Sequence, residues 1–201
     1  QTVAQVMRKA FPNTAIYNVY GLTEASPRVS YLPPDEFDNN PTSVGVPLSS
    51  LKAKVVDNEL LICGNNIMKG YYNNSKETAR VKQDGWLHTG DVAEMDGQGR
   101  IYIKCRKDNM IIRAGMNIYP QEIENAIKED ERIIDVLAYG VKNDTVSEKI
   151  HIKVVTTLSK SEVYNICKRK LLSYELPDVI DIVAELPKNA SGKVIRSVKG
   201  N

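Results

Sequence analysis

The sequence predicts an α/β region that ends in a small β-barrel or sandwich, followed by a compact α+β domain. Helix-like spacing over residues 3–10 leads into a short apolar run over residues 13–19, which predicts a buried strand. Short β runs separated by glycines fill residues 42–102. After Arg106 the pattern changes, and helix-like and strand-like segments alternate. This change of pattern indicates two parts.

The boundary between the two parts is expected near Arg106 to Asp108, with residues 1–105 in the first part and 106–201 in the second. In the first part, turn-forming residues such as Asp57-Asn58 and several glycines bound the β runs. Short strands at this spacing are typical of a small barrel or sandwich. The expected strands cover residues 52–56, 59–63 and 101–104.

The second part is expected to contain two helices and three strands. The first helix runs from Pro120 to Glu129, with proline in its first turn and apolar residues along one face. The second helix begins after Ser159, which has a capping-box spacing to Glu162, and is expected to close at Pro177. The strands are expected over residues 133–141, 150–157 and 179–183.

Composition excludes several classes of protein. The 201 residues include 27 basic and 25 acidic side chains, for a net charge of +2 without a basic stripe, so nucleic acid is not an expected partner. No apolar run approaches the roughly 20 residues that span a bilayer, so no membrane span is expected. Three cysteines in no CxxC pair predict neither a disulfide framework nor a zinc site, which favours a cytoplasmic location.

The chain starts at Gln1 rather than at methionine, and a helical pattern begins within three residues of it. It also lacks the charged and apolar regions of a signal peptide. We therefore expect the sequence to be a piece of a longer protein.

Four motifs carry candidate chemistry, and the first is Tyr20-Gly21-Leu22-Thr23-Glu24. It follows directly after the expected strand, where polar side chains can converge on a ligand at the edge of a sheet. A hydroxyl and a carboxylate at this point suit a phosphate and its magnesium ion. The alternative is a simple loop that leads to a helix cap.

The second motif is the run Trp86-Leu87-His88-Thr89-Gly90-Asp91. An aspartate held after a tight glycine turn can accept both hydroxyls of a ribose, which is how acidic residues act in other nucleotide sites. The alternative is an Asx turn, in which Asp91 bonds only its local backbone. His88 is expected to have a positional rather than a catalytic role.

The third motif is Arg106-Lys107-Asp108, followed by a segment that contains Gly115, and the fourth surrounds Ser191-Gly192-Lys193. Lysine on a flexible turn can deliver an ammonium group to a phosphate. The alternatives are a surface charge at Arg106 and a solvated basic tail at Lys193.

Taken together and in this order, the motifs resemble those of the adenylate-forming enzymes, a superfamily of acyl-CoA synthetases, peptide-synthetase adenylation domains and luciferases. The resemblance runs from Tyr17 to Arg196 and is strongest to the acyl-CoA ligases. It implies the end of a large adenylate-forming domain, with a sheet edge and a small β-barrel, followed by a small α+β lid domain. It also implies ATP or AMP, Mg²⁺ and CoA as ligands and a carboxylic acid as substrate.

The resemblance also implies a role for each matching residue. Tyr20 and Gly21 would lie against the adenine, Thr23 would bond the α-phosphate, and Glu24 would hold Mg²⁺. Asp91 would bind the ribose, and Arg106 the ribose or phosphate. Asp108 would be the hinge, Lys193 would bridge the carboxylate and the α-phosphate, and Gly115 would border the path of the thiol.

Two departures from the family pattern qualify this implication. Cys105 stands where the family usually has glycine, which a β conformation tolerates. The family's phosphate loop and the acyl pocket have no match in these residues. We therefore expect this chain to be part of an ATP-dependent acyl-CoA ligase, and we expect this part alone to be inactive. The alternatives are a subunit that loads the phosphopantetheine of a carrier protein, and a non-catalytic nucleotide-binding module.

Overall fold

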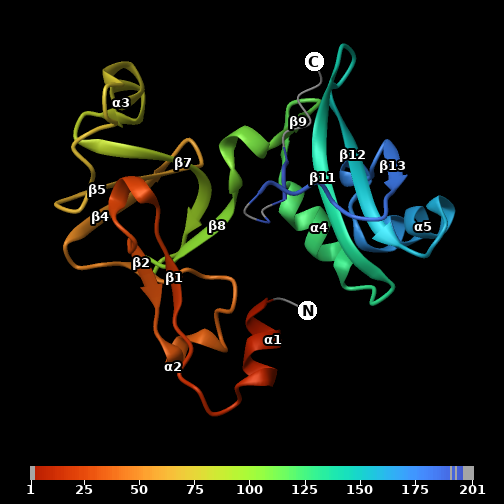
Figure 1. Ribbon diagram of the computed structural model, residues 1–201, viewed down its shortest axis with the longest axis horizontal. Coiled ribbons are helices and arrows are strands. Elements are labelled where there is room, and N and C mark those ends of the chain that lie inside the picture. Colours follow the sequence, from red (N-terminus) through yellow and green to blue (C-terminus); the bar gives the residue numbers. More distant parts are fainter. Residues whose placement is uncertain (1–2, 191, 193, 197–201) are drawn as a thin grey trace. The chain divides into compact units, whose positions relative to one another are not determined.

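A computed structural model describes residues 3–190, 192 and 194–196 of the chain (Figure 1). The chain forms two compact units that divide between Lys107 and Asp108. No helix in the described ranges is both long and apolar enough to cross a membrane. All three cysteines fall within these ranges, and none forms a disulfide.

The first unit begins with helix α1 (Val3–Ala10) and an antiparallel three-stranded sheet in the order β1-β2-β3. The strand expected over residues 13–19 is shorter than predicted. Arg8 Nη1 donates to the carbonyl of Thr14 at 3.0 Å, so a side chain rather than a neighbouring strand satisfies that backbone group. The strands are β1 (Asn18–Tyr20), β2 (Ser30–Leu32) and β3 (Val46–Pro47), with the short helix α2 (Pro34–Phe37) after β2.

The rest of the first unit is a five-stranded antiparallel sheet in which β7 is the central strand. β4 pairs with β5 and β5 with one edge of β7, while β6 and β8 pair with two halves of the other edge of β7. The described ladders make a sheet, and its closure into a barrel stays a prediction. The elements are β4 (Leu51–Val56), β5 (Glu59–Gly64), α3 (Ser75–Val81), β6 (Lys82–Gln83), β7 (Trp86–Met95) and β8 (Ile101–Arg106).

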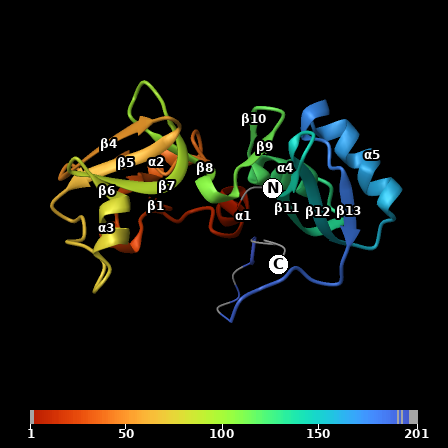
Figure 2. The same ribbon diagram turned by 90° about the horizontal axis from the view of Figure 1, so that it is seen from above.

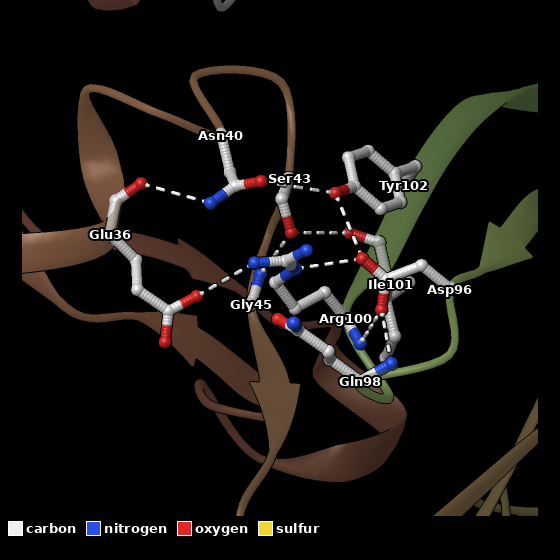
Figure 3. A network of polar contacts seen from close by, with 9 residues as sticks. All are labelled: Glu36, Asn40, Ser43, Gly45, Asp96, Gln98, Arg100, Ile101 and Tyr102. Atoms are coloured by element: carbon white, nitrogen blue, oxygen red, sulfur yellow. Dashed lines mark hydrogen bonds and ion pairs between the residues drawn. The ribbon is translucent and has the colours of Figure 1, made fainter.

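A polar network joins the two sheets of the first unit (Figure 3). Asp96, in the turn between β7 and β8, accepts hydrogen bonds from the backbone and side chain of Arg100, and Arg100 also reaches Glu36 at 3.2 Å. Ser43 Oγ donates to the carbonyl of Ile101 at 3.1 Å. The segment before β3 is thereby fixed to the start of β8.

The second unit is a five-stranded sheet in the order β10-β9-β12-β11, with β13 parallel to β12. Helices α4 and α5 cover one face, where Ile123, Ile127, Val163 and Ile166 pack with apolar residues of β11 and β12 in a single core. Figure 2 shows α5 alongside β13. The elements are β9 (Ile111–Arg113), β10 (Met116–Ile118), α4 (Pro120–Lys128), β11 (Ile133–Asn143), β12 (Ser147–Thr156), α5 (Lys160–Lys170) and β13 (Val179–Ile182).

Both predicted helices form, but α5 ends earlier than expected. The capping box is present, since the Ser159 side chain accepts from the backbone N–H of Glu162 and the Glu162 side chain accepts in return from Ser159. The helix ends at Lys170 because Leu171 adopts an extended conformation. The prediction that Pro177 closes this helix is therefore wrong, and a 3-10 turn at Ser173–Glu175 fills the interval.

Candidate functional site

The first unit brings Tyr20 and Asp91 into direct contact. Tyr20 is the last residue of β1 and Asp91 lies in the middle of β7, and the Tyr20 hydroxyl donates to Asp91 Oδ2 at 2.5 Å. Asp91 is only 7% exposed. Burial, followed by the negative charge of Asp91, raises the pKa of the Tyr20 phenol above its usual value. The phenol therefore stays protonated and remains a donor to the carboxylate.

Arg106 is the second partner of Asp91. The two residues are directly paired across β7 and β8, and Arg106 Nη1 donates to Asp91 Oδ1 at 3.1 Å and to the carbonyl of Thr89 at 2.9 Å. Its side chain is 54% exposed, so the guanidinium also faces solvent. Arg106 is therefore an exposed charge, as in the surface-charge alternative, and it is also bonded to the buried carboxylate of Asp91.

Gly90 allows this approach of the guanidinium. Its φ is +70°, and a Cβ built at this position would lie 3.0 Å from Arg106 Nη2. Thr89 shapes the same turn, since its hydroxyl donates to the carbonyl of Leu60 and accepts from the N–H of Asp91 at 3.1 Å. The Asx-turn alternative for Asp91 is therefore wrong, because the local backbone bond is made by Thr89.

Glu59 supports the turn from β5 and was not identified from the sequence as a site residue. Its Oε1 accepts from the N–H of Gly90 at 3.0 Å, and its Oε2 lies 2.9 Å from Lys107 Nζ and 3.4 Å from His88 Nδ1. Burial alone raises the pKa of this carboxyl, but the bonds from Lys107 and Gly90 outweigh it and hold the pKa below its usual value. A lone carboxylate in an apolar run, Glu59-Leu60-Leu61-Ile62, was the available signal.

Thr23 and Glu24 lie in a 3-10 turn, Thr23–Ala25, that follows β1. The residue before the turn is Leu22, whose side chain makes no capping bond, so the loop leads into a 3-10 turn without a side-chain cap. Glu24 Oε1 accepts from the Tyr71 hydroxyl at 2.7 Å. This bond, with a smaller contribution from burial, raises the pKa of Tyr71 to about 12.

Gly21 is required by the path of the same loop. A Cβ at this position would lie 2.1 Å from the carbonyl oxygen of Pro27, so any side chain would collide with backbone. The loop between β1 and β2 therefore folds back tightly on Gly21.

The donor set of this loop fits a magnesium ion that arrives with a substrate. In the part of the chain that the structure describes, no group of three His, Cys, Asp or Glu side chains could hold a metal by itself. Mg²⁺ usually binds through one or two carboxylates together with phosphate oxygens, so the single carboxylate of Glu24 is a suitable contribution from the protein.

The remaining expected site residues lie in the second unit or outside the described ranges. Asp108 is exposed and lies in the 3-10 turn Lys107–Asn109, where the two units divide. Gly115 has a φ of +80° and, with Ala114, connects β9 to β10 by a two-residue turn. Lys193 lies outside the described residues. Gly115 thus occupies a turn that needs a positive φ, and a Cβ there would meet nothing within 4 Å.

The departure at Cys105 has a simple outcome. Cys105 lies within β8 and is buried. Its position in an extended strand needs no glycine, as expected from the sequence.

The structure brings Tyr20, Asp91 and Arg106 together, and it places Gly21, Thr23 and Glu24 on the adjoining loop.

Two family models match parts of the chain. Residues 1–72 match the family model of the AMP-binding enzymes, and residues 122–193 match that of the AMP-binding enzyme C-terminal domain. The chain belongs to the AMP-binding enzyme family.

Curated relatives of the chain include CoA ligases. The chain is 37% identical to a long-chain-fatty-acid–CoA ligase of Escherichia coli, over 88% of this chain and 34% of the relative. It is 36% identical to a 2-succinylbenzoate–CoA ligase of Listeria monocytogenes, over 89% of this chain and 39% of the relative. The chain therefore spans about a third of the length of the relatives it matches.

Solved structures show the same fold. An o-succinylbenzoate CoA synthetase from Bacillus subtilis, in complex with its acyl-adenylate intermediate, matches with a TM-score of 0.89 at 27% identity, over 98% of this chain and 43% of that one. The same enzyme in complex with ATP and magnesium matches with a TM-score of 0.86 at 28% identity, over 96% and 42%. These neighbours bind the nucleotides that the motifs of the present chain suggest.

Proposed function

We propose that this chain is part of an ATP-dependent ligase that activates a carboxylic acid as an acyl-adenylate and transfers the acyl group to CoA. The observation that carries the proposal is the cluster of Tyr20, Asp91 and Arg106, built on a chain whose relatives are CoA ligases. The particular acid is not specified by these residues. A cytoplasmic location, expected from the cysteines, belongs to the same proposal.

Asp91 is the proposed acceptor for the ribose hydroxyls. An ionised carboxylate has about four lone-pair sites, and the bonds from Tyr20 and Arg106 use two of them. The two donors hold the carboxylate in one orientation, so it can accept from ligand hydroxyls without reorganising. Tyr20 and Gly21 would border the adenine, and Arg106 would reach the ribose or the phosphate from its exposed side.

Thr23 and Glu24 are the proposed contacts to the α-phosphate and to its Mg²⁺. Two anions, a carboxylate and a triphosphate, must meet in the first step, and their repulsion opposes the reaction. Mg²⁺, when bound with ATP, supplies positive charge at the phosphates. Glu24 would hold that ion from the protein side, while the Thr23 hydroxyl would donate to a phosphate oxygen.

The second unit would supply the other groups. The ammonium of Lys193 would bridge the carboxylate and the α-phosphate during adenylation, where negative charge develops. Rotation about Asp108 would then withdraw Lys193 and bring the surface at Gly115 to the thiol. Both roles are proposals that rest on the family resemblance and on the position of Asp108 where the two units divide.

The test is a substrate panel with the full-length enzyme. ATP and a series of carboxylic acids are supplied with and without CoA, and pyrophosphate release and acyl-CoA are both measured. Acid-dependent pyrophosphate release, together with acyl-CoA formation when CoA is supplied, supports the proposal. Adenylation without transfer to CoA, but with transfer to a phosphopantetheine carrier protein, would assign the carrier-loading function instead. Nucleotide binding without pyrophosphate release for any acid would indicate a non-catalytic module.

A further inference from the structure

A buried carboxylate in the second unit is not used by the proposed chemistry. Glu124 lies in α4 and is only 6% exposed. Its Oε1 accepts from the backbone N–H of Ala138 at 2.9 Å. Ala138 is in β11, which is an edge strand of the sheet, so Glu124 satisfies an N–H group that points away from the ladder. An ionised group that is removed from water needs such partners, and ideally a counter-charge.

Arg196 supplies the counter-charge from 72 residues away in the sequence. Its Nη1 donates to Glu124 Oε1 at 2.5 Å and its Nη2 donates to Oε2 at 2.8 Å. This is the bidentate arrangement for which the planar guanidinium is suited, and it fixes direction as well as distance. The chain at Arg196 is therefore held against α4.

The chain that leads to Arg196 is held as well. Leu186 is buried and packs with Leu137 and Tyr139 on the face of β11 opposite to the main core, and Val194 packs against the same cluster. Lys188 and Val194 form an isolated antiparallel bridge. The N–H of Ile195 donates to the carbonyl of Pro187 at 2.8 Å. Residues 189–193 thus connect two segments that are both fixed to the second unit.

We propose that Glu124 is a positioning residue, which through Arg196 fixes the chain immediately after Lys193. Arg196 is three residues from Lys193, so the two Cα atoms are at most about 11 Å apart. Lysine carries its charge on a flexible four-carbon stem, so a fixed chain beside the turn that carries Lys193 narrows the positions that the ammonium group can reach. The role of Lys193 rests on the proposed function, whereas the anchoring of residues 194–196 does not.

The simpler interpretation is that Glu124 and Arg196 only stabilise the second unit. Asp178 offers a matched control for this interpretation. Its Oδ1 accepts from Arg113 Nη2 at 3.0 Å and its Oδ2 accepts from the N–H of Ile150 at 2.8 Å, so it also joins an arginine to a strand N–H. Unlike Arg196, its partner Arg113 lies in β9 and outside the segment that contains Lys193.

The first experiment compares Glu124→Gln with Asp178→Asn in the full-length enzyme. Adenylation is measured by acid-dependent pyrophosphate release, and the second half-reaction by thioester formation from supplied acyl-adenylate. We expect Glu124→Gln to slow adenylation at least about tenfold, because a misplacement of 1 Å costs about a hundredfold, and to spare the thioester step. Asp178→Asn should affect both steps by less than about threefold. Equal losses in the two half-reactions would overturn the proposal.

A double-mutant cycle tests whether Glu124 acts through Lys193. In a Lys193→Ala background the positioning role has nothing left to position, so adding Glu124→Gln should slow adenylation no further. Losses that multiply would show that Glu124 acts independently of Lys193 and would overturn the proposal. Arg196→Lys, which keeps the charge but loses the bidentate bond, serves if Glu124→Gln fails to fold, and should give the same pattern.

Hydrogen exchange separates this inference from the proposed function. If the wild-type enzyme activates no acid, the proposed function fails, but the anchoring can still be measured. Exchange in a peptide that covers residues 186–196 should speed up in Glu124→Gln and stay unchanged in Asp178→Asn, because release of Arg196 lets the bond from the N–H of Ile195 to the carbonyl of Pro187 open more often. Unchanged exchange in Glu124→Gln would overturn the anchor whatever the enzyme catalyses.

Discussion

The hydroxyl of Tyr20 lies 2.5 Å from Asp91 Oδ2, although 71 residues separate them in the sequence. One residue ends β1 of the three-stranded sheet and the other lies in β7 of the five-stranded sheet. The contact therefore depends on the packing of two sheets, and the network around Asp96 and Ser43 holds those sheets together. A candidate ribose site is thus built across a junction within the first unit.

Tyr20→Phe tests whether this bond prepares Asp91 for its ligand. The substitution removes one donor from a buried carboxylate, which costs about 1–3 kcal/mol, and leaves Asp91 free to turn toward Arg106. We expect the KM for ATP in the full-length enzyme to rise about tenfold, with a smaller change in kcat. The measurement is steady-state kinetics at saturating acid and CoA.

Tyr102→Phe is the matched control, because the Tyr102 hydroxyl donates to Asp96 at 3.2 Å in the same unit but away from Asp91. It should leave the KM for ATP unchanged, because Asp96 keeps its bonds from the backbone N–H of Gln98 and from the backbone and side chain of Arg100. Equal increases in KM for the two variants would mean that Tyr20 acts only through the stability of the unit.

Gly90→Ala separates backbone strain from crowding of Arg106. Gly90 has a φ of +70° and a Cβ would lie 3.0 Å from Arg106 Nη2, whereas Gly85 has a φ of +81° and a Cβ there would meet nothing within 4 Å. Alanine at either left-handed position should lower the free energy of unfolding by about 1–2 kcal/mol. Only Gly90→Ala should also weaken ATP binding, by displacing the guanidinium. Calorimetric titration and thermal melting together measure both effects, and normal ATP affinity in Gly90→Ala would contradict the placement of Arg106 at the nucleotide.

Glu59→Gln tests the electrostatics beneath the turn. The folded pKa of Glu59 is lowered from its usual 4.5, so its charge stabilises the fold above pH 4.5 and this contribution is lost as the pH falls through the folded pKa. The difference in free energy of unfolding between wild type and Glu59→Gln should therefore be largest near neutral pH and shrink below about pH 4.5. Trp86 is the single tryptophan of this chain and lies in β7. Its fluorescence therefore measures the unfolding of the first unit.

An exposed carboxylate provides the comparison for Glu59. Glu94 pairs with Lys104 at 3.3 Å, and its side chain is 67% exposed. Exposed pairs contribute about 0–1 kcal/mol, so Glu94→Gln should change the free energy of unfolding little at neutral pH. A Glu59→Gln variant as stable as wild type at neutral pH would show that its bonds to Gly90 and Lys107 contribute nothing net.

The sequence predicted the elements whose signals are local. Periodicity located α4 and the strands β4, β5, β8, β11 and β12 to within a few residues, and the capping box located the start of α5. The ends of elements were less predictable. The carbonyl of Thr14 is taken by Arg8, and α5 ends at Lys170, seven residues before the proline that was expected to close it. Both outcomes depend on contacts that a local pattern does not contain.

The candidate site was predictable as a set of residues but not as a set of bonds. The motifs named Tyr20, Asp91 and Arg106, yet their mutual hydrogen bonds require β8 to pair with β7 in one register and the two sheets to pack. Glu59 was not identified because its role depends on the approach of Gly90 from β7 and of Lys107 from the 3-10 turn after β8. Glu124 was hidden for the same reason, since its partner follows 72 residues later.

Gly115 has a φ of +80° and open surroundings, which separate two explanations for glycine at this position. Strain alone would cost about 1–2 kcal/mol for any other residue, so Gly115→Ala and Gly115→Leu should lower the melting temperature by similar amounts. If the thiol passes over this turn, only the leucine side chain should obstruct it. We therefore expect Gly115→Leu to slow thioester formation from supplied acyl-adenylate at least about tenfold, by the sensitivity of such steps to misplacement, while adenylation stays within about twofold of Gly115→Ala. Gly99→Leu, at a φ of +78° with nothing within 4 Å of a Cβ, carries the same strain in the first unit and should slow neither step selectively. A Gly115→Leu enzyme with a normal thiol step would leave the left-handed turn between β9 and β10 as the whole reason for this glycine.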